Sequence, residues 1–203
     1  DMRIGSKLTV AVGLAAMVVG FVMNTFFEVD TAYWYVAISI GLIGTAIGMA
    51  MTPATNSIMG ALPREKAGVG SATNDATRQV GGTLGVAVLG AILSKEYATK
   101  LDRSLDTLPS EVQDRIAPFR VTLETSVDAA VKLSEKARAD GAPAEYVNDV
   151  IGFAKQAFVE GQSFAYMFAA GTAAIGLIIT VIWLPARSSG ASTSAQRRAP
   201  VGD

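Results

Sequence analysis

The side chains best placed for chemistry lie in a short polar stretch, residues 71–79, that precedes an apolar run. Asp75 and Arg78 are three residues apart, so on a helix they share one face and can form an ion pair. The pair is either an ordinary interfacial contact, with Arg78 reaching towards lipid headgroups, or a gate contact that breaks as a protein opens. Asp75 is also a local candidate for a proton carrier, but an exposed aspartate is ionised throughout the neutral range, which argues against that role.

A second polar group lies inside the longest uncharged run of the chain, residues 31–62. Pro53 frees a backbone carbonyl and allows a kink, while Asn56 and Thr52 can hydrogen-bond a ligand or a neighbouring helix. Met49, about one turn earlier, suits a promiscuous apolar pocket and ordinary core packing equally well. These residues either line a substrate path or shape and pack a helix, and both interpretations stay open.

The composition excludes several classes of catalyst. Among 203 residues there is no cysteine and no histidine, which rules out disulfides, thiolate or imidazole metal ligands, a catalytic cysteine and a Ser-His-Asp triad. We therefore expect no enzyme, no metal site and no cofactor. The formal net charge of −1 provides no basic field, so we expect no nucleic-acid partner.

Charged side chains gather in one segment, because residues 95–160 hold 21 of the 35 in the chain. A bilayer core of about 30 Å needs roughly 20 helical residues, and three uncharged runs reach that length. The run at residues 80–93 has only 14 residues, and its completion would draw Arg78 and Asp75 to the membrane edge. Ionisable groups at that depth usually face protein or a water-filled cavity, which is the first sign of a functional site.

The sequence thus predicts an all-α integral membrane protein with four transmembrane helices and an external helical insertion. Basic residues in the short loops and ends lie on one side of the predicted membrane, which the positive-inside rule places in the cytoplasm together with both ends of the chain. The predicted segments are three transmembrane helices within 1–94 (about 8–27, 33–60 and 71–93), an external helical loop at 95–160, a last transmembrane helix at 161–186 and a disordered cytoplasmic tail at 187–203.

The loop at residues 95–160 is predicted to be helical. Apolar residues recur there every three or four positions, the period of one helix face, with Pro118 placed to bend or break the helix. Gly141 and Pro143 predict a turn into a second helix. We therefore expect an antiparallel pair of helices that covers the outer end of the membrane bundle.

The first residues, DMRIGSKLTV, lack an initiator methionine and lead at once into an apolar run of 20 residues. That run exceeds the roughly 7–15 residues of a secretory signal, and no small-residue cleavage site follows it. We expect the chain to be an interior fragment of a longer protein.

The segment PREKAGVGSA at residues 63–72, followed by Asn74 and by RQVGGTLGVA at residues 78–87, resembles a major facilitator superfamily transporter. It is similar to the penultimate span of the fourteen-span EmrB/QacA-type drug:proton antiporters. The opening residues Arg3, Gly5 and Lys7 resemble a remnant of the superfamily's short cytoplasmic motif, although Met2 stands where that motif has aspartate. The chain would then be the last four spans of such a transporter.

The resemblance implies export of small hydrophobic or drug-like compounds across the plasma membrane by proton antiport. Two helical bundles would rock about a central site, and the missing N-terminal spans would complete it in the lipid bilayer. The second run would line the cavity, with Thr52, Asn56 and Met49 on the substrate path. The third run would lie between the bundles, and its gating or inter-bundle residues would be Asn74, Asp75, Arg78, Gln79, Gly81, Gly82 and Gly85.

Two glycine pairs, Gly44 with Gly48 and Gly81 with Gly85, have the spacing that lets membrane helices approach closely. They either pack helices statically or form a surface on which bundles slide. The alternative function is a membrane-anchored sensor or interaction protein whose residues 95–160 form an external ligand-binding module. An intramembrane enzyme is not supported, because nothing in the chain assembles a nucleophile and a base.

Overall fold

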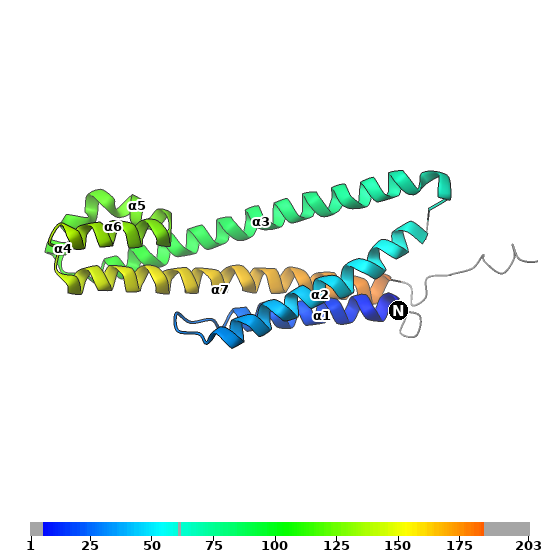
Figure 1. The fold of residues 1–203 in the computed structure, drawn as a ribbon, viewed down its shortest axis with the longest axis horizontal. Helices are drawn as coiled ribbons and strands as arrows, with labels where there is room; N and C mark the ends of the chain where they lie inside the picture. Colours follow the sequence, from blue (N-terminus) through cyan, green and yellow to red (C-terminus); the bar gives the residue numbers. More distant parts are fainter. Residues whose placement is uncertain (1–5, 61, 185–203) are drawn as a thin grey trace, which may run out of the picture.

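The computed structural model describes residues 6–60 and 62–184, and every regular element in those ranges is a helix (Figure 1). Four of the helices are long and apolar enough to cross a membrane, which confirms the predicted all-α membrane fold. The elements in chain order are α1 (Ser6–Asn24), α2 (Tyr33–Gly60), the 3-10 helix η1 (Arg64–Lys66), α3 (Ala67–Leu105), α4 (Ser110–Ile116), the 3-10 helix η2 (Ala117–Phe119), α5 (Arg120–Thr125), α6 (Val127–Ala139) and α7 (Ala144–Trp183).

Two helices are far longer than a membrane requires. The 39 residues of α3 and the 40 residues of α7 each run without a break from an apolar stretch into the charged segment. At 1.5 Å per residue each helix is about 60 Å long, roughly twice a bilayer core. The charged segment, residues 95–160, is called the helical cap below. The cap is therefore joined to the apolar part by two continuous helices. The position of the membrane boundary along these helices stays a prediction.

The helical cap differs from the simple pair of helices expected from its sequence. The predicted turn before α7 is present, with Gly141 at φ 91° and Pro143 directly before the helix. The first helix of the expected pair is broken into α4, η2, α5 and α6. Pro118 lies in the 3-10 turn η2, and Ser126 is extended, its hydroxyl accepting a hydrogen bond from the Ala129 amide at 3.1 Å. Proline and a capping serine thus end helices that the apolar period alone would have continued.

The main hydrophobic core lies in the helical cap and not between the apolar helices. Leu101 and Leu105 of α3 are fully buried there, against Leu123 of α5 and Ala154 of α7. The Tyr97 hydroxyl donates a hydrogen bond to the Leu123 carbonyl at 2.8 Å. Burial of this phenol raises its pKa to about 12, with a smaller contribution from the nearby carboxylate of Glu124. These contacts give the cap a packed interior of its own.

The apolar helices form a looser arrangement. α1 packs against both α2 and α7, whereas α3 packs mainly against α7 and diverges from α1 and α2 (Figure 1). No residue of the apolar window of α3 is buried. Exposed apolar side chains on this scale need lipid or further protein around them.

Candidate functional site

The ion pair expected from the sequence is present at the start of α3. Arg78 Nη1 lies 3.6 Å from Asp75 Oδ1, and both side chains are exposed. Arg78 Nη2 also contacts the Met51 sulfur of α2 at 3.7 Å. Arg78 therefore connects its own helix with the helix that carries the expected substrate-path residues.

A cavity lies beside this connection, between the end of α2 and the start of α3. Its volume is about 520 Å³, and its walls include Ile58 and Leu62 from the α2 side. Asn74 and Thr77 of α3 line it as well, so one residue of the predicted gating set faces this space. A Cβ at Gly70 would meet the tip of the Leu62 side chain, a flexible group that can turn aside, so this glycine eases the close approach of the two walls.

The other residues predicted to gate or to contact a second bundle lie on a part of α3 that the described helices leave uncovered. Gln79, Gly81 and Gly82 are exposed and Gly85 is half-buried. A Cβ added at any of these three glycines would meet no atom within 4 Å in the part of the chain that is described. Static packing and sliding therefore both stay predictions, since the partner surface is not among the described residues.

The predicted substrate-path residues lie in the second half of α2. Thr52 and Asn56 are exposed, and the Thr52 hydroxyl donates to the Gly48 carbonyl at 3.4 Å. Met49 is half-buried against α1, with its Cβ 3.2 Å from the position that a Cβ at Gly13 would take. The sulfur that reaches α3 belongs to Met51, which spacing alone did not distinguish from its neighbours.

The cytoplasmic motif remnant falls mostly outside the described residues. This applies to Arg3 and Gly5, whereas Lys7 lies in the first turn of α1. That turn is at the same end of the molecule as the connection between α2 and α3 (Figure 1).

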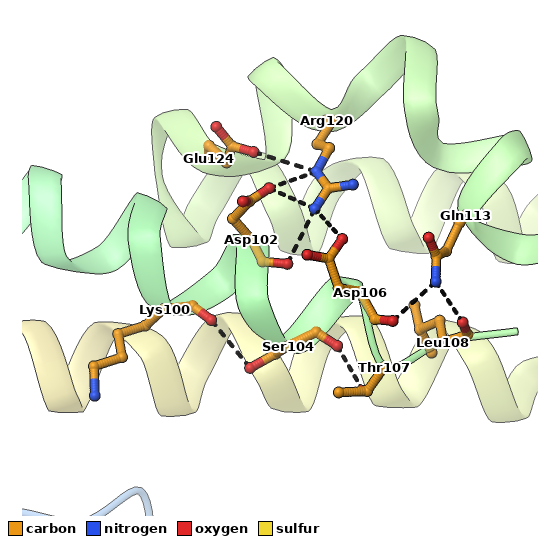
Figure 2. Close-up of polar contacts among 9 residues, drawn as sticks. All are labelled: Lys100, Asp102, Ser104, Asp106, Thr107, Leu108, Gln113, Arg120 and Glu124. Carbon is orange, nitrogen blue, oxygen red and sulfur yellow. Dashed lines mark hydrogen bonds and ion pairs between the residues drawn. The ribbon is translucent and has the colours of Figure 1, made fainter. Parts of the chain in front are cut away.

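A charged network that the sequence did not reveal ties α5 to the end of α3 (Figure 2). Arg120 Nε donates to Asp102 Oδ1 at 2.6 Å, and its Nη2 donates to Asp106 Oδ1 at 2.6 Å and to the Asp102 carbonyl at 3.1 Å. Glu124 Oε1 lies 3.7 Å from Arg120 Nε. Burial and the neighbouring Asp102 raise the pKa of Glu124, while Arg120 opposes that shift. The network fastens the start of α5 to the last turns of α3.

Among the described residues, no group of acidic side chains is arranged to hold a metal ion. What the geometry defines is a multi-pass membrane protein, with an ion pair and a cavity at one end of its apolar helices and a folded helical cap at the other.

Comparison with known proteins shows which members of this class the chain is similar to. The chain is 29% identical over 202 residues to the multidrug resistance protein Stp of Mycobacterium tuberculosis, a match covering 98% of this chain and 36% of Stp. It is 22% identical to the multidrug transporter protein MdtP of Bacillus subtilis, over 96% of this chain and 37% of MdtP. It is 25% identical to the methyl viologen resistance protein SmvA of Salmonella typhimurium, over 80% of this chain and 30% of SmvA.

The resemblance to drug transporters of the major facilitator type is thus confirmed along almost the whole chain. The chain spans about a third of the length of these relatives. No protein-family profile and no solved structure matches it.

Proposed function

We propose that the chain forms part of a secondary active transporter that exports small hydrophobic or drug-like compounds by proton antiport through alternating access. The observation that carries this proposal is the match of 98% of the chain to a multidrug resistance protein. The four helices long enough to cross a membrane support it as well. Spans outside this chain would supply the rest of the translocation path and the main proton-coupling groups.

In this proposal the start of α1, the α2–α3 connection and the end of α7 face the cytoplasm across the plasma membrane. All three lie at one end of the molecule (Figure 1). That end carries Lys7 and Lys66 together with the acid Glu65, whereas the loop at the opposite ends of α1 and α2 carries Glu28 and Asp30 and no basic residue. Basic residues on one side and acidic residues on the other agree with the positive-inside rule.

We further propose that the open surface of α3 receives a second bundle of helices. Small residues allow close approach of membrane helices, and Gly81, Gly82 and Gly85 leave room for it. The exposed Thr52 and Asn56 of α2 would then line the substrate path on the adjoining side.

The Asp75–Arg78 pair would act as an inner gate. Arg78 bridges α3 and α2 through Met51, so a separation of the two helices must break that contact. The ion pair itself lies within α3 and survives that separation, and at about 0.2–1 kcal/mol it holds the Arg78 side chain only weakly, so the contact with Met51 can be made and broken in every cycle. The pair would bias the equilibrium between inward-open and inward-closed states without locking either one.

The test is the substitution Arg78→Ala in the longest reading frame that contains this chain. Loss of about 1 kcal/mol from one conformational state should lower efflux of a fluorescent drug-like compound up to about fivefold at unchanged membrane expression. Arg103→Ala is the matched control, because Arg103 is an exposed arginine on the same helix but in the helical cap. Efflux equal to that of the unmodified protein in both variants would exclude the gate.

A further inference from the structure

The helical cap contains a second cavity, at the opposite end of the molecule from Arg78. Its volume is about 510 Å³, within the range of small-molecule sites in proteins. It lies between α4 and η2 on one side and α6 and the start of α7 on the other. The proposed transport function assigns no role to this space.

The walls of the cap cavity are mainly apolar. Val112, Ile116, Leu133 and Tyr146 line it, and each packs against the buried core of the cap while staying only partly buried itself. Phe119 adds a second aromatic ring to the wall. Apolar surface left uncovered beside a finished core favours a ligand that removes it from water.

A hydroxyl that opens into the cavity provides a polar contact of the site. Ser134 of α6 lines the cavity, is only 6% exposed, and makes no hydrogen bond to another described residue. Its oxygen is not one of the fully buried unpartnered atoms of the described residues, so it is accessible from the cavity and free to hydrogen-bond there. A ligand that offers a hydrogen-bonding group at this point would satisfy the hydroxyl.

The charges around the cavity indicate what kind of ligand fits. Glu111 and Asp140 contribute two acids to its lining, and Arg115 and Lys136 contribute two bases. The signs balance, so the site attracts neither anions nor cations as a class. We propose that the cap cavity binds an uncharged, mainly apolar small molecule of drug-like size that carries a hydrogen-bonding group.

This proposal goes beyond the transport function and does not depend on it, because it needs only the folded cap. The absence of cysteine from the chain allows a direct test. Ser134→Cys places the chain's single thiol inside the cavity, and its alkylation by a water-soluble maleimide is followed in lipid nanodiscs. Naphthol, an uncharged aromatic with one hydroxyl, serves as the probe ligand.

Naphthol at ten times its dissociation constant should slow alkylation of the S134C thiol about tenfold, because only the free fraction reacts. The control is S104C on α3, which lies in the cap but outside the cavity lining. Its rate should not change.

A second pair of substitutions, added to S134C, separates filling of the cavity from a general perturbation of the cap. Ala137→Trp fills the cavity and should abolish protection, whereas Ala139→Trp, exposed on the same helix and outside the lining, should preserve it.

Four results would overturn the proposal. The first is a S134C thiol that reacts only after unfolding, since the cavity would then be closed. The second is equal slowing of S134C and S104C, which would place naphthol in the lipid. The third is protection by naphthol that persists with A137W, because naphthol would then not be bound in the cavity. The fourth is protection that is already complete before naphthol is added and disappears on delipidation, which would assign the cavity to an acyl chain.

Discussion

Gly161 lies at a close approach between α3 and α7, and its substitution tests how the helical cap is attached to the apolar helices. A Cβ added there would lie 3.1 Å from the Tyr97 backbone nitrogen, 3.2 Å from the Leu93 carbonyl oxygen and 3.3 Å from Leu93 Cδ1. Two of these three atoms belong to the backbone of a continuous helix and cannot rotate away. Any side chain at Gly161 must therefore push the two helices apart.

Two opposing effects decide the outcome of Gly161→Ala. Alanine favours a helix interior over glycine by about 1 kcal/mol, whereas overpacking a closely fitted contact costs typically about 1–3 kcal/mol. We expect a net change between about zero and a loss of 2 kcal/mol in the stability of the cap. Gly161→Val adds two further methyl groups at the same crossing and should reach the upper end of that loss or exceed it.

Gly152 provides the matched control on the same helix, because a Cβ there would meet nothing within 4 Å. Gly152→Ala should gain up to about 1 kcal/mol from helix propensity alone. The measurement is amide hydrogen exchange of the cap in nanodiscs, with the opening free energy of the α3 amides as readout. If G161A stabilises the cap as much as G152A does, the crossing is not as close as the structure shows and the argument fails.

Two further predictions concern charged contacts of the helical cap. Arg120→Ala removes the charge-assisted hydrogen bonds to Asp102 and Asp106. It should destabilise the cap by about 1.5–3 kcal/mol in denaturant unfolding. A loss below about 0.5 kcal/mol, or full rescue by Arg120→Lys, would show that the planar guanidinium, which reaches both acids at once, is unimportant. The hydrogen bond from Lys100 lowers the pKa of Glu160 below its ordinary 4.5, so the pair stabilises the folded state above about pH 4.5 and this contribution is lost as the pH falls through the lowered pKa. Glu160→Gln should therefore lower stability by about 0.2–1 kcal/mol at neutral pH and by nothing in acid; an equal difference at both pH values would contradict this.

The sequence indicated four apolar helices because their signal is composition over about 20 residues, but it did not show that α3 and α7 continue unbroken into the helical cap. The start of α2 at Tyr33 and its end at Gly60 coincide with the predicted segment. The ion pair of Asp75 and Arg78 could also be predicted from the sequence, since residues three apart on one helix are neighbours. Each of these features depends only on local sequence.

Contacts between helices could not be predicted in the same way. The glycine pairs noted from spacing are open in the described part of the chain, while a Cβ at Gly13 or Gly161 would press against the backbone of a neighbouring helix. A glycine permits close packing, but the crossing angle and the partner's position decide whether it occurs. The Arg120 network depends likewise on α5 folding back onto α3, which no local pattern specifies.

The central proposal is that this chain is part of a proton-coupled drug exporter, and a flux measurement in proteoliposomes tests it most directly. The longest reading frame containing the chain is reconstituted with a pH-sensitive dye inside, and a hydrophobic drug-like compound is added. We predict compound-dependent proton movement that is abolished when a protonophore is added, whereas the 203-residue chain reconstituted alone should show none. Drug movement without accompanying proton flux, or no movement of either, in the longer protein would contradict the account.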